Sequence, residues 1–199
     1  MKQALKKILK ILHLYWPIVN WHNKNVRKKF HKKKQIPLLD FKRRFNPQIF
    51  METGTFHGEM VEAMRKKFKK IYSIELADVL FERAKTKFEK YPHIEILHGD
   101  SQSLLPTILE KINEPAFFWL DAHYSGGETS FAKEHSPIEY ELKSILDHHI
   151  KNHVILIDDV TNFVGINGYP TASTIENMAK LSGYECEIKY DNFRIYPKK

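Results

Sequence analysis

Acidic side chains follow several apolar runs of this chain, each at the point where the run ends. They are Glu52, Glu75, Asp121 and the adjacent pair Asp158 and Asp159, and the polar segment Gly99-Asp100-Ser101-Gln102 follows a fifth run. If these runs are parallel strands of one sheet, their carboxyl ends meet in one crevice, where open α/β sheets bind ligands. Several carboxylates in one crevice repel one another unless a cation offsets their charge. The pattern therefore predicts a ligand site that includes a cation.

Three of these acids have the arrangement of a metal site. Asp121 ends the apolar run 117–120, and Asp158 and Asp159 end the run 154–157. Three carboxylates, completed by water and substrate oxygens, suit Mg²⁺. We therefore predict that Asp121, Asp158 and Asp159 bind Mg²⁺.

The segment 48–75 predicts a second half of the site, because it reads as strand, glycine turn, helix and strand. Gly54 and Gly58 in the turn allow the backbone to pass close to a ligand. Glu75 lies 21 residues after Gly54, near the spacing expected of an acid that accepts ribose hydroxyls. The middle glycine of a pyrophosphate-binding turn is absent, so adenosine without phosphates fits better than NAD.

Alternating strands and helices must position these residues. We expect strands over 48–52, 70–75, 93–98, 117–120 and 154–157, helices over 58–68, 77–90 and 171–182, a helix opening at Asp100 and another around Leu142, and a hairpin of 184–190 with 192–197. Continuous apolar strands are typical of a mostly parallel sheet with helices on both faces. A polar loop, 122–135, lies between the fourth strand and the next helix.

Composition and charge limit the number of domains, the cellular compartment and the nature of the N-terminal extension. A chain of 199 residues suits one domain with a proper core. Its single cysteine, Cys186, excludes an intrachain disulfide and agrees with a reducing compartment, so we expect a cytoplasmic protein. Residues 1–47 hold 14 Lys and Arg against one acid, whereas 48–199 carry a net charge of −5. We therefore expect a basic, partly helical extension over 1–47 and one domain over 48–199.

The extension has three interpretations. Apolar residues of 3–16 share one helical face, which favours packing on the domain or on a partner subunit, as in a homo-oligomer. A basic amphipathic helix can also lie on an anionic membrane surface, here the inner one, or contact nucleic acid. Pro37 and Pro47 are expected to bracket a linker into the first strand. His148, His149 and His153 are expected to form a solvated helix end rather than a metal cluster.

Over about 48–197 the chain resembles class I S-adenosylmethionine-dependent methyltransferases, and within them the metal-dependent O-methyltransferases of the catechol O-methyltransferase type. The resemblance is carried by Glu52-Thr53-Gly54-Thr55-Phe56-His57-Gly58, by Glu75, by Gly99-Asp100-Ser101-Gln102 and by the three aspartates. It implies a seven-stranded Rossmann-like sheet of order 3-2-1-4-5-7-6. It also implies that S-adenosylmethionine contacts Glu52, Gly54, Thr55, Phe56, Gly58, Glu75, Asp100, Ser101, Gln102 and Asp121.

The chain departs from that family at the catalytic base. Catechol-type enzymes have a lysine near the metal, and Asp121-Ala122-His123-Tyr124 offers none. His123 is the natural substitute, since a neutral imidazole accepts a proton from a hydroxyl whose pKa a metal has lowered. We therefore expect His123 and Asp121 to be catalytic.

The expected reaction is methyl transfer to a hydroxyl of a small molecule or saccharide. The main alternative is a nucleic-acid methyltransferase, prompted by the basic extension; amino-methylating relatives usually carry an Asn/Asp-Pro-Pro-aromatic tetrad, which is absent here. A non-catalytic adenosine-binding or membrane-docking module is a third interpretation. An NAD-dependent oxidoreductase is disfavoured by the missing glycine and by the lack of a Tyr-x-x-x-Lys pair.

Overall fold

Seven strands form one sheet in a computed structural model that describes residues 32–121, 136–166 and 168–198. The strands are β1 (Ile49–Thr53), β2 (Lys70–Glu75), β3 (Ile94–His98), β4 (Ala116–Leu120), β5 (Val154–Ile157), β6 (Tyr184–Lys189) and β7 (Asn192–Pro197). Their order is β3-β2-β1-β4-β5-β7-β6, and β7 alone runs antiparallel to its two neighbours. The predicted fold class and strand order are confirmed.

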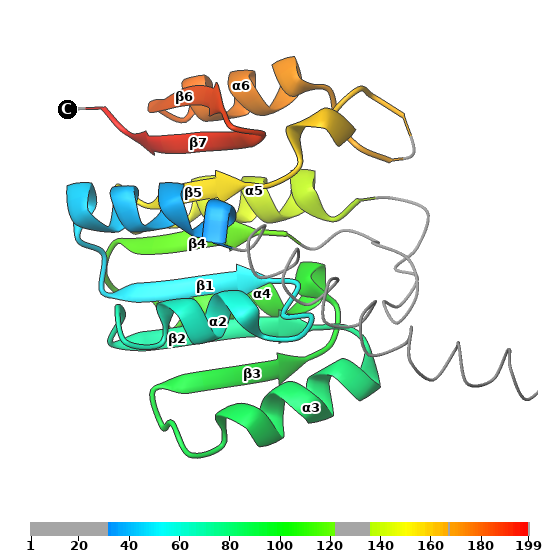
Figure 1. Cartoon of the computed structure of the whole chain (residues 1–199). Helices are drawn as coiled ribbons and strands as arrows, with labels where there is room; N and C mark the ends of the chain where they lie inside the picture. Colours follow the sequence, from blue (N-terminus) through cyan, green and yellow to red (C-terminus); the bar gives the residue numbers. More distant parts are fainter. Residues whose placement is uncertain (1–31, 122–135, 167, 199) are drawn as a thin grey trace, which may run out of the picture. The chain divides into compact units, whose positions relative to one another are not determined.

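Helices cover both faces of the sheet (Figure 1). They are α2 (Glu59–Met64), α3 (Asp78–Phe88), α4 (Ser101–Leu109), α5 (Ile138–Asp147) and α6 (Ala172–Leu181), with a 3₁₀ turn, η1, over Val160–Asn162. Helices α2 and α3 lie on one face, and α4, α5 and α6 on the other. The strand residues between them are almost completely buried, which explains why the strands read as continuous apolar runs.

Helix α2 is shorter than the helix predicted over 58–68. It ends at Met64, and the backbone N–H of Lys67 bonds the Met64 carbonyl in a tighter turn. Phe68 reaches the core from this turn, where its ring lies 5.1 Å from that of Phe50. The apolar spacing that suggested a longer helix therefore reflects packing of a turn.

The chain divides between Leu39 and Asp40 into two compact units, and the larger one holds the sheet. The linker expected between Pro37 and Pro47 is wrong, because 32–45 is helical. Within the larger unit this helix packs through aromatic contacts: the Phe41 ring lies 5.3 Å from that of Tyr196, and the Arg44 guanidinium 4.5 Å from the same ring. Such packing outweighs the one backbone hydrogen bond that an internal proline removes.

The basic helix expected over 3–16 lies outside the described residues. Among those that are described, no helix is both long and apolar enough to span a membrane.

Candidate functional site

Backbone hydrogen bonds continue past the strand ends and align the acidic residues. The N–H of Asp121 bonds the Thr53 carbonyl at 3.1 Å, and the N–H of Asp158 bonds the Leu120 carbonyl at 3.1 Å. On the other side of β1, the N–H of Gly54 bonds the Ile74 carbonyl at 3.0 Å. The tips of β2, β1, β4 and β5 therefore end at one level, as the sequence pattern predicted.

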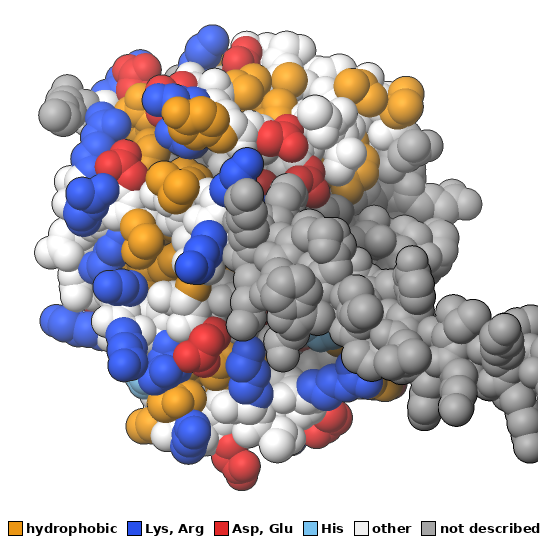
Figure 2. Space-filling model, viewed as in Figure 1, with side chains coloured by type: hydrophobic (Ala, Val, Ile, Leu, Met, Phe, Trp, Pro, Cys, Tyr) orange, Lys and Arg blue, Asp and Glu red, His pale blue; other side chains and the backbone are white. Residues whose placement is uncertain are grey.

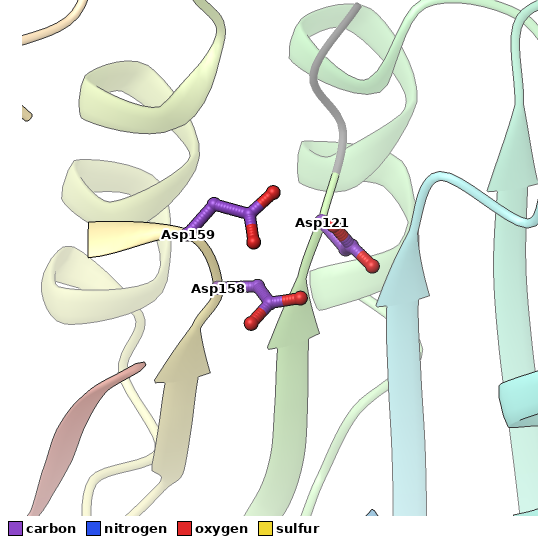
Figure 3. Close-up of side chains that lie close together, drawn as sticks. All are labelled: Asp121, Asp158 and Asp159. Atoms are coloured by element: carbon purple, nitrogen blue, oxygen red, sulfur yellow. The ribbon is translucent and has the colours of Figure 1, made fainter. Parts of the chain in front are cut away.

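The three aspartates meet at the ends of β4 and β5 (Figure 3). One carboxylate oxygen from each of Asp121, Asp158 and Asp159 lies within 4.8 Å of the other two. The Asn192 side-chain amide donates to Asp158 Oδ1 at 2.5 Å and fixes that carboxylate. Three closely spaced carboxylate oxygens form a donor set that suits a hard divalent cation such as Mg²⁺.

A left-handed residue explains how two consecutive aspartates share this cluster. Successive side chains of an extended strand point to opposite faces. Asp159 has φ 55° and ψ 55°, and this turn directly after β5 brings its carboxylate to the same side as that of Asp158. The conformation is unfavourable for residues other than glycine, although aspartate tolerates it better than most.

The glycine turn after β1 is held by Glu75. Glu75 Oε2 accepts the backbone N–H of Phe56 at 2.7 Å, and Oε1 accepts that of Ala77 at 2.9 Å. Each carboxylate oxygen can accept a second hydrogen bond, so both keep capacity for a ribose hydroxyl. Gly58 has φ +67°, and a Cβ there would lie 2.6 Å from Phe88 Cε2, so only glycine fits.

A buried chain of hydrogen bonds through Glu52, Ser73 and Thr55 supports this turn. The Ser73 hydroxyl donates to Glu52 Oε2 at 2.6 Å and lies 2.6 Å from the Thr55 hydroxyl. Burial raises the pKa of Glu52 well above its ordinary value; the hydrogen bond from Ser73 opposes the rise, and the charges of Asp121 and Glu75 add to it. Glu52 and Thr55 thus lie inside the protein beneath the turn. Ser73, which links them, gave no signal in the sequence.

The segment after β3 begins helix α4. Asp100 is the N-cap, and its Oδ1 accepts the backbone N–H of Gln102 at 3.3 Å. Ser101 is buried at the first position of the helix, whereas Gln102 is half-buried. These residues follow β3 directly, at the same edge of the sheet as Glu75, which pairs with His98 of that strand.

Two residues near the aspartates escaped the sequence reasoning. Asn192 begins β7 and contacts Asp158, although it is distant in sequence. Tyr169 lies in a loop closed by a bridge between Val164 and Thr171. Burial raises the pKa of the Tyr169 phenol, and the charges of Asp159 and Asp121 raise it further, which places this half-buried ring near the cluster. The only signal for Tyr169 in the sequence was its position between Gly168 and Pro170.

The expected base, His123, and the loop 122–135 lie outside the described residues. The expectation of a solvated histidine cluster is wrong for two of its three members, since His148 and His153 are buried. The Ala116 N–H donates to His153 Nδ1 at 3.0 Å, and His153 Nε2 lies 3.0 Å from His148 Nδ1. These three ring nitrogens thus bond the start of β4 and each other, at the opposite end of the strands from the aspartates.

Comparisons with known proteins gave matches in structure alone. No family model matches the sequence. No curated protein matches it either.

Similar solved structures include three methyltransferases. A methyltransferase of Podospora anserina with S-adenosylhomocysteine bound is 15% identical, with a TM-score of 0.56 over 80% of this chain and 75% of that one. The O-methyltransferase TomG of Streptomyces achromogenes, in complex with S-adenosylmethionine, is 16% identical, with a TM-score of 0.55 over 79% of this chain and 77% of TomG. The N-methyltransferase NodS of Bradyrhizobium japonicum is 13% identical, with a TM-score of 0.56 over 85% and 98%. At these identities the comparisons show the fold: the chain has the Rossmann-like fold of methyltransferases.

Proposed function

We propose that this protein is an S-adenosylmethionine-dependent, Mg²⁺-dependent O-methyltransferase that acts on a hydroxyl of a small molecule or saccharide. The observation that carries the proposal is the meeting of two half-sites at neighbouring strand ends. Glu75 and the glycine turn lie at the tips of β1 and β2, and the three aspartates lie at the tips of β4 and β5. A methyl donor and a hydroxyl acceptor bound at these half-sites would lie side by side.

The residues around β1 and β2 would bind the donor. Glu75 would accept the two ribose hydroxyls through the lone pairs that Phe56 and Ala77 leave unused. Gly54 would keep the turn free of a side chain where the donor approaches, Gly58 allows the turn to pack against Phe88 of α3, and Ser101 and Gln102 would lie beside the adenine. When bound, S-adenosylmethionine supplies an electrophilic methyl group, so these residues contribute by orientation, which can account for a large part of such a rate enhancement.

The residues around β4 and β5 would bind the acceptor. Asp121, Asp158 and Asp159 would hold Mg²⁺, which when bound lowers the pKa of a coordinated hydroxyl. Asn192 keeps the Asp158 carboxylate in place through its hydrogen bond. His123 would accept the proton of the acceptor hydroxyl, because a neutral imidazole with a pKa near 6.5 is a competent base at neutral pH.

The aspartate cluster favours oxygen over nitrogen as the atom methylated. The fold serves both chemistries, since the similar structures include an O-methyltransferase and an N-methyltransferase. A hydroxyl oxygen is a weak nucleophile until it loses its proton, whereas the nitrogen of a neutral amine can attack before it loses one. A cluster of three carboxylates that suits a divalent cation therefore supports a hydroxyl acceptor.

A nucleic-acid acceptor is the second candidate, because residues 1–47 carry a net charge of +13. On the face shown in Figure 2, the Lys and Arg side chains of the described residues are separated by apolar and acidic ones rather than gathered in one stripe. Filter binding to RNA and DNA at two salt concentrations distinguishes the two candidates. Phosphate contacts would give tight binding that falls steeply with salt.

Calorimetry with S-adenosylhomocysteine, with and without Mg²⁺, tests the proposal without the acceptor. We expect one molecule to bind per chain, and we expect Mg²⁺ to raise the thermal midpoint of unfolding, since a ligand that binds only the folded state stabilises it. Absence of binding would contradict the cofactor assignment. Binding without any effect of Mg²⁺ would contradict the metal assignment alone.

A further inference from the structure

The tip of the C-terminal hairpin is hydrogen-bonded to the turn that carries Asp159. Asp191 lies in the short loop between β6 and β7. Its carbonyl accepts the backbone N–H of Val160 at 3.1 Å, and its side-chain Oδ1 accepts that of Thr161 at 3.1 Å. Asp191 therefore bonds the two backbone N–H groups that directly follow Asp159.

One of these groups, the Thr161 N–H, is the usual partner of a side chain in the position of Asp159. Asp159 is the N-cap of η1, and the first N–H groups of a helical turn have no partner within that turn. An N-cap aspartate commonly accepts the N–H of the second residue, here Thr161, and does so from an extended conformation. Asp159 is left-handed instead, and its side chain makes no capping hydrogen bond. One of its carboxylate oxygens lies within 4.8 Å of oxygens of Asp121 and Asp158.

The loop that presents Asp191 does not have the residues that suit its backbone best. Tyr190 has φ 52° and Asp191 has φ 64°, so both are left-handed. Hairpin loops of this kind favour Asn-Gly, because glycine adopts positive φ without strain. A turn aspartate usually bonds its own backbone nearby, whereas the Asp191 carboxylate bonds Thr161, 30 residues away. The side chain at this position therefore stabilises the neighbouring turn rather than the hairpin itself.

Loss of the Asp191 carboxylate would leave the Thr161 N–H to another acceptor. Water could accept this hydrogen bond, because Thr161 is exposed. The Asp159 carboxylate could also accept it if Asp159 relaxed to the extended N-cap conformation, which an aspartate adopts more easily than the left-handed one. That carboxylate would then be turned away from Asp121 and Asp158.

We propose that Asp191 is a positioning residue of the metal site: by bonding Thr161 it keeps the Asp159 carboxylate from capping η1 and so turned towards the cation. The inference rests on the proposed function, because it assumes that the three aspartates bind Mg²⁺. Asp191 is not itself a member of the aspartate cluster. The site would thus depend on the tip of the β6–β7 hairpin as well as on its metal ligands.

Replacing Asp191 by glycine separates its side chain from its backbone conformation. Glycine suits the left-handed position, so Asp191→Gly should fold, with a thermal midpoint in the absence of Mg²⁺ close to that of the unmodified protein. The variant lacks the side-chain acceptor for Thr161. Its Mg²⁺ affinity, measured by calorimetric titration with Mg²⁺ alone, should therefore fall by about tenfold, as is common when a group that orients a metal ligand is lost. Its affinity for S-adenosylhomocysteine should not change, because Glu75 and the turn after β1 are intact.

Two further variants distinguish the hydrogen bond of Asp191 from its charge. Asp191→Asn loses the charge, but its amide oxygen can accept the Thr161 N–H and asparagine tolerates the left-handed conformation. Its Mg²⁺ affinity should stay within about twofold of that of the unmodified protein, since salt screens an exposed charge. Glu185→Gln removes an exposed charge from β6 of the same hairpin and should bind Mg²⁺ as the unmodified protein does.

Four outcomes would count against the inference. Normal Mg²⁺ affinity in Asp191→Gly would overturn it, and so would an equal loss in Asp191→Asn, because charge alone would then explain the effect. If Asp191→Gly fails to fold or also loses affinity for S-adenosylhomocysteine, Asp191 stabilises the fold in general and the inference is overturned. If the unmodified protein does not bind Mg²⁺, the proposed metal site itself fails, and that outcome is distinct from Mg²⁺ binding that does not depend on Asp191.

Discussion

Ionisable side chains are buried at both ends of the parallel strands: Glu52 and Glu141 at the carboxyl edge, where these strands end, and His148 and His153 at the amino edge, where they begin. Burial disfavours the charged form of each group, so it shifts the pKa values of the acids and of the histidines in opposite directions. At the carboxyl edge, burial raises the pKa of Glu52 and of Glu141. At the amino edge, burial lowers the pKa of His148, and that of His153 to about 3. The physical cause is the same in both places, because a charge loses its hydration when it leaves water.

The two edges differ in where their hydrogen bonds lead. The histidine rings bond each other and the start of β4, so they connect elements of the fold. Glu52 accepts a hydrogen bond from Ser73 of β2, whose hydroxyl also contacts that of Thr55 in the turn after β1. Glu141 accepts one from Thr53 at the end of β1, and a ligand is expected at these strand ends. A shifted pKa alone therefore does not identify a functional site, and the direction of the hydrogen-bond chain decides between structure and function.

The edges also oppose each other in the pH dependence of stability. Glu141 has a folded pKa above its unfolded value of 4.5, so its contribution is complete below pH 4.5 and is lost as the pH rises towards 7. His153 has a folded pKa below its unfolded value of 6.5, so its contribution is complete above pH 6.5 and is lost as the pH falls towards 3.

The largest expected effect comes from removing carboxylates of the proposed metal site at the carboxyl edge. Replacing Asp121 and Asp159 together by Asn should abolish any rise of the thermal midpoint with Mg²⁺, because two of three negative charges are lost. Thermal unfolding with and without Mg²⁺ measures this effect. Asp147→Asn, which removes an exposed carboxylate at the C-terminal end of α5, is the matched control. Its thermal midpoint should respond to Mg²⁺ as that of the unmodified protein does. A persistent Mg²⁺ effect in the double variant would rule out the cluster as the metal site.

A smaller effect is expected at the cofactor half of the same edge. Glu75→Ala should weaken binding of S-adenosylhomocysteine by about ten- to hundredfold, since hydrogen bonds to a charged group contribute ~1.5–3 kcal/mol. Calorimetry measures the affinity, and thermal unfolding checks that the turn survives loss of the bonds to Phe56 and Ala77. Glu95→Ala, a partly exposed acid on neighbouring β3, should bind normally. Equal affinities for both variants would remove the ribose assignment.

The smallest effect is expected at the amino edge and should leave the ligand site untouched. His153→Asn keeps an acceptor for the Ala116 N–H but removes the titrating ring. The fall of the thermal midpoint between pH 6.5 and 4.5 should become shallower, while the smaller side chain lowers stability by about 1–3 kcal/mol. Exposed His149→Asn should keep the original slope. If both variants follow the unmodified protein, the buried pair does not control acid stability.

The sequence predicted the strands and the level at which the acids lie, because each rests on a local pattern. The strand order was predicted by the resemblance to a known fold and not by any local pattern. Each apolar run indicates a strand, and the acid that follows it, such as Asp121 or Glu75, indicates where that strand ends. Contacts between distant segments left no such pattern: Ser73, Asn192 and Glu141 act through partners 18 to 88 residues away. The helical segment around Pro37 and the burial of His153 were mistaken for the same reason, since packing partners elsewhere in the chain decided both.

The insertion of β7 between β5 and β6 has a consequence for how the protein is made. Asp158 leaves the ribosome well before Asn192, the residue that fixes its carboxylate. During synthesis the first five strands can pair while this aspartate still lacks its amide partner. The cation affinity that we propose for this cluster should therefore develop last, when the C-terminal hairpin pairs with β5, and a nascent chain that already has all three carboxylates should bind a cation more weakly.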